Sequence, residues 1–157
     1  MKKIVLVSDN HSDMEVLKKI YEANQDADYF LHCGDSEKKP ADLLPFISIR
    51  GNNDSGYDFP LELIYEIEGH RILMLHGHRH LSLTSNDNLI YKAQQDEVDL
   101  CFYGHTHIYA DYEAEGIRFV NPGSCWWNRD GSEPSFAIVY LDGPNIKVEK
   151  KVISEVM

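Results

Sequence analysis

The chain has 157 residues, of which 43% are hydrophobic and 26% charged, as in globular proteins rather than disordered or fibrous ones. This length suffices to bury one hydrophobic core, so we expect a single domain spanning residues 1–157. With 15 Lys and Arg residues against 26 Asp and Glu residues, the formal charge is −11, which argues against broad electrostatic binding to nucleic acids or anionic membranes.

The cysteines and the first residues indicate the compartment. Cys33, Cys101 and Cys125 form no Cys-x-x-Cys pair, and an odd number of cysteines argues against a disulfide framework. The apolar run Ile4–Val7 stops at Ser8, which is too early for a secretory signal or a membrane span. We therefore expect a cytoplasmic protein that does not bind membranes.

The first third of the chain alternates predicted strands with a helix. Ile4–Val7 is a continuous apolar run, as expected of a strand that is covered on both faces. Helical spacing of apolar residues predicts a helix over Asp13–Tyr21. Tyr29–Leu31 and Phe46–Ile49 are predicted as further short strands. This order is typical of the beginning of an α/β domain.

The remainder is dominated by three predicted hairpins. They pair Leu61–Ile67 with Arg71–Leu75, Ile108–Ala114 with Ile117–Val120, and Phe136–Leu141 with Ile146–Val152. Between the first two lie a predicted helix, Asn86–Gln95, and a buried strand, Leu100–Tyr103. We expect an α/β fold in which two mixed β-sheets are sandwiched between helices.

Polar residues able to bind metal follow five of these strands, and each cluster contains or adjoins a glycine. The clusters are Asp9-Asn10-His11, Gly34-Asp35, Gly51-Asn52-Asn53-Asp54, His76-Gly77-His78 and Gly104-His105-Thr106-His107. Because ligands bind outside the carboxyl ends of strands in α/β sheets, we expect these clusters to converge on one crevice. Carboxylate, imidazole and amide ligands suit Mn, Fe, Zn or Ni. They are numerous enough for two ions, which together can clamp a phosphate and activate a water.

The five motifs, in this order, resemble those of the calcineurin-like metallophosphoesterases, and most closely their small bacterial and archaeal phosphodiesterase branch. Asn121-Pro122-Gly123-Ser124 is similar to a further loop of that branch. The resemblance implies the αββα fold of that family. It also implies hydrolysis of a small phosphate ester, more readily a phosphodiester than a phosphoprotein, by a hydroxide that bridges two metal ions.

The resemblance also assigns the metal ligands. It places Asp9, His11, Asp35 and His107 around one ion, and Asp35, Asn52, His76 and His105 around the other, with Asp35 bridging. We expect two divalent cations, with Mn²⁺ preferred over Zn, Fe or Ni. Two alternatives stay open: a non-catalytic protein-binding scaffold on the same fold, as in the retromer subunit branch, and a dinuclear hydrolase of non-phosphate substrates.

One position departs from part of the family. Phosphoprotein phosphatases carry a histidine, thought to be a general acid, where this chain has Asn53, which cannot supply a proton. The leaving group would then be protonated by His78, by metal-bound water or by solvent, or would be acidic enough to need little help. The candidate catalytic residues are therefore Asn53, His78 and Asp54, with Asp54 expected to orient a ligand.

The other histidines are expected to lie outside the metal shell. His32 is predicted to be packed in the core or behind the ligands, His70 to be solvated in a hairpin turn, and His80 to lie at the surface.

Five further side chains near the motifs have simpler expected roles. Arg50 and Arg79 are expected to form ion pairs with the acidic surface, and Asn10 to face the mouth of the site. Trp126 and Trp127 either stack on a base or aromatic leaving group, or cover the core edge or an oligomer interface. Self-association through hairpin edges stays open as well.

Overall fold

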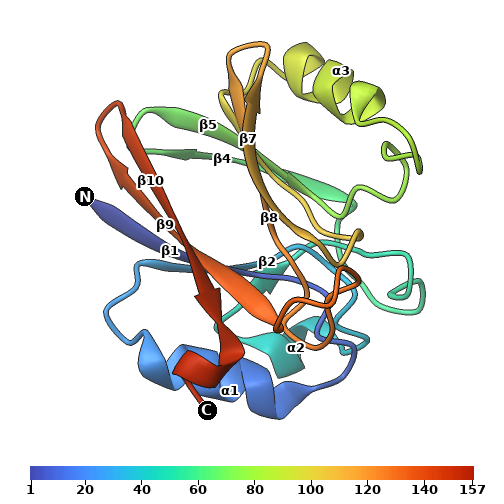
Figure 1. Cartoon of the computed structure of the whole chain (residues 1–157), viewed down its shortest axis with the longest axis vertical. Helices are drawn as coiled ribbons and strands as arrows, with labels where there is room; N and C mark the ends of the chain where they lie inside the picture. The colour runs from blue at the N-terminus through green and yellow to red at the C-terminus, as the bar shows by residue number, and fades with distance from the viewer.

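Two five-stranded sheets form the centre of the molecule in the computed structural model, which describes residues 1–157 (Figure 1). The first sheet has the order β10 (Asn145–Val152), β9 (Ser135–Asp142), β1 (Lys2–Val7), β2 (Tyr29–His32) and β3 (Ile47–Ser48). The second has the order β4 (Glu62–Ile67), β5 (His70–Leu75), β6 (Leu100–Phe102), β8 (Ile117–Pro122) and β7 (Tyr109–Ala114).

Each sheet combines parallel and antiparallel pairs. In the first sheet β1, β2 and β3 run parallel, and the hairpin β9–β10 adds antiparallel strands at the other edge of β1. In the second sheet β5, β6 and β8 run parallel, with β4 and β7 antiparallel at the edges. The predicted fold of two mixed sheets is therefore confirmed.

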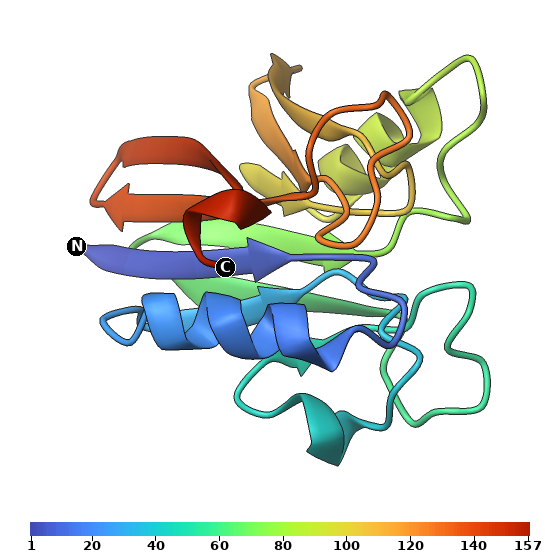
Figure 2. The ribbon, with the colours of Figure 1, turned by 60° about the horizontal axis from the view of Figure 1, so that its bottom comes forward.

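Alternate side chains of the central strands enter different core layers. Ile4 and Leu6 of β1 pack between the two sheets, whereas Val5 and Val7 pack on the outer face of the first sheet against α1 (Met14–Ala23). Figure 2 shows α1 lying along that face. On the second sheet, Leu73 packs with residues of α3 (Asp87–Gln95), such as Leu89. Strands covered on both faces explain why the sequence has continuous apolar runs there.

The helices begin where the sequence offers suitable residues. Asp13 caps α1, since its side chain accepts a hydrogen bond from the backbone N of Val16. Two short elements were not predicted from the sequence, α2 (Pro40–Leu43) and the 3₁₀-helix η1 (Ile153–Glu155). Elements of three or four residues are too short to display a helical period. None of the helices combines the length and the apolar character that crossing a membrane requires.

The predicted exposure of His70 is wrong. His70 is the first residue of β5 and only 6% exposed. Its Nδ1 lies 2.5 Å from Oδ2 of Asp99, and its Nε2 lies 2.6 Å from the carbonyl oxygen of Gly143. The imidazole thus links the start of β5 to the β9–β10 turn of the other sheet, a contact between residues that are 73 positions apart.

Replacing His70 with alanine is expected to destabilise the fold by about 1–3 kcal/mol, because the hydrogen bond to Gly143 between the sheets and the contact with Asp99 within the second sheet are both lost. Chemical denaturation would measure the change. Lys147→Ala is the control: its ion pair with Glu149 is exposed, so less than about 1 kcal/mol is expected. Equal effects of the two substitutions would contradict the linking role of His70.

Candidate metal centre

The five polar clusters converge, as predicted, at the carboxyl ends of the strands. Backbone hydrogen bonds join the loops to one another: Asp9 N donates to the Gly34 oxygen at 3.0 Å, and His11 N to the Asp35 oxygen at 3.1 Å. Across the sheets, His105 N donates to Oδ2 of Asp9 at 3.1 Å. The centre is therefore built from both sheets.

The backbone of this centre is unusual. Five of the seven predicted ligands have positive φ angles: Asp9 (55°), His11 (42°), Asp35 (62°), His105 (71°) and His107 (58°). The left-handed conformation is unfavourable for residues with a side chain and persists where the surrounding structure enforces it, often at functional sites.

Three predicted ligands form a first group. Oδ1 of Asp9 lies 3.4 Å from Nε2 of His107 and 3.8 Å from Nε2 of His11. The two imidazoles approach each other with their Nε2 atoms 3.2 Å apart. One ligand atom from each residue could therefore contact a single cation, since all three lie within 4.8 Å of one another.

The other four form a second group next to the first. Nε2 of His76 lies 3.3 Å from Oδ2 of Asp35 and 3.0 Å from Oδ1 of Asn52. Nδ1 of His105 lies 3.1 Å from the same amide oxygen. Asp9 Oδ1, 3.7 Å from His76 Nε2, connects the two groups.

Contacts on the far side of three imidazoles hold their Nε2 atoms toward the centre. Nδ1 of His76 donates to the Cys33 carbonyl oxygen at 2.6 Å, and Nδ1 of His107 donates to that of Trp127 at 2.9 Å. Nδ1 of His11 lies 2.8 Å from Oε2 of Glu37. Such partners fix the ring orientation and leave the inner nitrogen free as a ligand. Sequence analysis missed Glu37, whose only signal was its position two residues after Asp35.

Asp54 and Asn53 lie behind the ligands rather than among them. The Asp54 carboxylate accepts the backbone N–H groups of Asp35, Gly51 and Glu37 at 2.8–2.9 Å. It thus holds the loops that carry two predicted ligands. Asn53 donates to both oxygens of Asp35, from its backbone N at 2.9 Å and from its Nδ2 at 3.1 Å.

His32 and Asn10 form a buried pair behind the ligands. His32 is fully buried and bonds to Oδ1 of Asn10 at 2.8 Å, and burial lowers its pKa to about 4. Asn10 is itself fully buried, so its predicted place at the mouth of the site is wrong.

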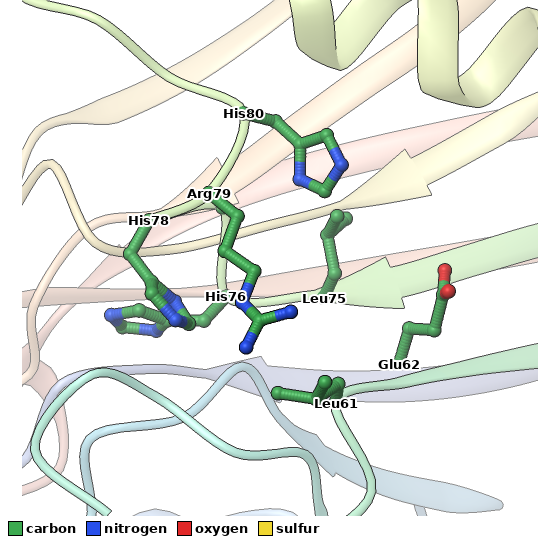
Figure 3. A pocket seen from close by; sticks show the side chains of 8 residues that line it. Leu61, Glu62, Leu75, His76, His78, Arg79 and His80 are labelled. Atoms are coloured by element: carbon green, nitrogen blue, oxygen red, sulfur yellow. The ribbon is translucent and has the colours of Figure 1, made fainter.

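The predicted ion pairs of Arg50 and Arg79 are wrong, because neither guanidinium has a carboxylate partner within 4 Å. By contrast, Arg71 pairs with Glu66 and Arg118 pairs with Asp111. Arg79 and His80 line a cavity of about 70 Å³ beside His76 (Figure 3). His78 lines it as well, and its buried Nδ1 has no hydrogen-bond partner.

Asp9 carries a buried negative charge. Burial raises the pKa of its carboxyl, but the imidazoles of His76 and His107 and the Ser8 hydroxyl outweigh that effect and lower it. Its Oδ1 is buried without a hydrogen-bond partner. A buried, unpartnered carboxylate oxygen surrounded by imidazole nitrogens is the donor set that a divalent cation takes, so the residues present fit a metal.

Charges also shift the pKa values of the surrounding groups. Burial lowers the pKa of His76, but the carboxylates of Asp9 and Asp35 raise it to about 9 overall. Burial raises the pKa of Asp35, but its hydrogen bond with His76 and the nearby imidazole charge lower it to about 2. In the absence of metal, His76 thus carries the positive charge that balances the carboxylates.

Two glycines allow the loops to approach the carboxylates. A Cβ at Gly51 would collide with Oδ1 of Asp35, and a Cβ at Gly104 would collide with the Ser8 hydroxyl and lie 2.8 Å from Oδ2 of Asp9. Glycine is therefore required at both positions for the carboxylates to stay in place.

Comparison with known proteins identifies relatives over most of the chain. The sequence model of the calcineurin-like phosphoesterase superfamily domain matches residues 1–143. The probable metallophosphoesterase YsnB of Bacillus subtilis is 34% identical over 143 residues, which are 88% of this chain and 84% of YsnB.

Solved structures show the same fold. A predicted phosphoesterase from Streptococcus pneumoniae TIGR4 is 29% identical and superposes with a TM-score of 0.89 over 98% of this chain and 90% of that one. An archaeal phosphodiesterase is 22% identical, with a TM-score of 0.74 over 95% of this chain and 99% of its own. Vps29 of Entamoeba histolytica, complexed with Zn²⁺, is 19% identical, with a TM-score of 0.74 over 96% of this chain and 99% of that chain.

Substituting Gly104 with alanine is expected to weaken Mn²⁺ binding about 10- to 100-fold, since the methyl group displaces the Asp9 carboxylate. Isothermal titration calorimetry would measure the affinity. Gly56→Ala is the matched control, because a Cβ there meets no atom within 4 Å, and its affinity should be unchanged. Wild-type affinity in the Gly104 variant would exclude this steric requirement.

The stability of the metal-free protein is expected to fall as the pH rises from about 6.5 through 9. The pKa of His76 is raised from 6.5 to about 9 in the folded state, so its stabilising contribution is complete below 6.5 and lost above about 9. The raised pKa of His107 acts in the same direction. Thermal denaturation in the presence of a chelator would record the melting temperature against pH.

Replacing His76 with glutamine should flatten this slope. His80→Gln should preserve it, because burial lowers rather than raises the pKa of His80. A melting temperature of the metal-free wild type that rises over the interval would show that His76 does not balance the carboxylates.

Proposed function

The chain belongs to the calcineurin-like phosphoesterase superfamily, a family of metal-dependent phosphoesterases, and we propose that it is a phosphodiesterase with a dinuclear metal centre. The observation that carries this proposal is the array of seven inward-facing ligand side chains around the buried, unpartnered Oδ1 of Asp9. An incomplete array would have favoured a protein without catalytic activity.

The two groups of ligands suggest how two ions would be held. Asp9, His11 and His107 would hold one, and Asn52, His76 and His105 the other, with Asp35 completing both. When bound, the cations supply positive charge to the phosphoryl oxygens and activate a water for in-line attack. We propose Mn²⁺ as the metal, since carboxylate, imidazole and amide ligands suit it, with Zn, Fe and Ni as alternatives.

Three arginines favour an anionic substrate. Arg50, Arg79 and Arg129 form no ion pair, although the chain has a net charge of −11. Arg79 lines the cavity beside His76, and the backbone N of Arg129 donates to the His107 carbonyl oxygen at 2.8 Å. Guanidinium groups without carboxylate partners are available to bind phosphate oxygens.

The residues next to the ligands favour a diester with an acidic leaving group. Asn53 uses its amide to hold Asp35, so we propose that it positions that carboxylate and donates no proton to the substrate. His78, with its unpartnered Nδ1, is the side chain that we propose contacts the leaving group. Asp54 keeps the loops of Asp35 and Gly51 in place. The archaeal phosphodiesterase of the same fold supports the preference for diesters.

We also propose that residues 1–157 form one domain in the cytoplasm. The first strand, β1, pairs with β9, and β9 pairs with β10, so both ends of the chain lie in one sheet. The three cysteines are free and buried, which agrees with a reducing compartment.

The purified protein with Mn²⁺ is expected to hydrolyse bis(4-nitrophenyl) phosphate more efficiently than 4-nitrophenyl phosphate, and to lose this activity when a chelator removes the metal. Asp35→Ala should lower kcat/KM more than about 100-fold, because it removes the ligand common to both proposed ions. Asp58→Ala is the matched control: it removes an exposed carboxylate without an ion pair from a neighbouring loop and should leave kcat/KM unchanged.

Failure to hydrolyse either ester with any of the four metals would overturn the proposal. Retained metal binding with no hydrolysis would favour the alternative of a non-catalytic scaffold. Vps29, which was solved in complex with Zn²⁺, has the same fold. Hydrolysis that phosphate and vanadate do not inhibit would favour a non-phosphate substrate.

A further inference from the structure

Two tryptophans stand at the edge of the metal centre. The ring of Trp126 lies 5.1 Å from that of His11, and the ring of Trp127 lies 6.0 Å from that of His107. Both imidazoles belong to the first group of ligands. The two indoles thus lie next to two of the predicted metal ligands.

Half of each indole is open to solvent. Trp126 is 50% exposed and Trp127 is 52% exposed, and neither takes part in a hydrophobic core cluster. Neither indole nitrogen forms a hydrogen bond within the protein, whereas buried tryptophans usually find a partner. These facts favour contact with a ligand over a role in covering the core edge.

The loop that carries the tryptophans is held rigidly. The hydroxyl of Ser124 accepts the backbone N–H groups of both Trp126 and Trp127 at 2.9–3.0 Å and donates to the carbonyl oxygen of Asp9 at 2.8 Å. Asn128 closes the loop by accepting the N–H of Ser124 at 2.7 Å. These bonds fix the backbone from which the indoles project, and a fixed backbone reduces the entropy lost on binding a substrate there.

We propose that Trp126 and Trp127 form a stacking platform that selects phosphate esters carrying a planar aromatic or heteroaromatic group. With the phosphate at the ligands, the ester group next to it lies beside His11 and His107 and reaches the exposed indole surface. Stacking on an indole is favourable for any aromatic ring. Arg129, two residues after Trp127, donates its backbone N–H to the His107 carbonyl oxygen at 2.8 Å and adds a cationic residue next to this ligand. This inference rests on the proposed phosphoesterase function.

Pairs of ligands that differ only in the ring test the platform. Isothermal titration calorimetry with Mn²⁺-loaded protein would compare adenosine 5′-phosphate with ribose 5-phosphate, and phenyl phosphate with cyclohexyl phosphate. We expect the aromatic member of at least one pair to bind roughly 5- to 100-fold more tightly. Preference in the first pair alone points to a nucleobase, and preference in both points to any aryl group.

Fluorescence supplies a second measurement that does not depend on turnover. Trp126 and Trp127 are the only two tryptophans of the chain, so its indole emission reports on this loop alone. Adenosine 5′-phosphate should quench or shift that emission more strongly than ribose 5-phosphate does at equal saturation.

Substitutions separate stacking from a structural role. Trp126→Ala and Trp127→Ala should each reduce the ratio of aromatic to non-aromatic affinity toward one, while Trp→Tyr at the same positions should restore most of it. Tyr91→Ala removes an aromatic residue that is 60% exposed on α3 and should leave the ratio unchanged.

Three results would overturn the platform. The first is equal affinity within both pairs of ligands, and the second is a ratio of aromatic to non-aromatic affinity that does not change when the indoles are removed. The third is a dimer, detected by analytical ultracentrifugation, that the alanine variants dissociate without any change in this ratio. If the ratio responds as expected but no ester is hydrolysed, the platform stands and the proposed catalytic function fails. The two proposals can therefore fail separately.

Discussion

The buried carboxylate of Asp9 is the group around which the rest of this structure is arranged. Taking a charged carboxylate out of water is costly unless opposite charge and hydrogen-bond donors surround it. Oδ2 of Asp9 accepts hydrogen bonds from the Ser8 hydroxyl and the backbone N–H of His105, and Oδ1 faces imidazoles. The backbone carbonyl oxygen of Asp9 accepts a hydrogen bond from the Ser124 hydroxyl. Residues from widely separated parts of the chain thus meet because they share one negative charge.

The loops around this charge have a strained backbone. Positive φ angles at Asp9, Asp35 and His107 turn the chain sharply after each strand and aim the side chains at one point. Each such angle costs on the order of 1 kcal/mol or more, which the apolar layers on both sides of the sheets offset. Rigid strands therefore support a backbone that would be unstable in an isolated loop.

The strands could be predicted from the sequence because their signal is local. Ile4–Val7 is apolar without interruption since both faces of β1 are covered, and the residues that follow it carry the motif that begins the site. The convergence of the clusters could be expected from the general placement of ligands at strand ends.

What could not be predicted depends on contacts between distant segments. His70 was expected in water, yet the opposite hairpin covers it through Gly143. The position of Glu37 two residues after Asp35 did not reveal its role, because that role comes from meeting His11 after the loops fold together. The indoles of Trp126 and Trp127 could be read in two ways until their distances to His11 and His107 were known.

The pairing of β1 with β9 has a consequence for how the protein is made. Lys2–Leu6 are paired in the finished sheet with residues 137–141, which are made much later. During synthesis β1 therefore lacks one neighbour until β9 has been made, and such distant contacts form slowly. A nascent chain holds Asp9 and His11 long before it holds His107 and the Ser124 loop. The complete ligand set can therefore form only after the segment that carries His105 and His107 has been made and has folded onto the loop that follows β1.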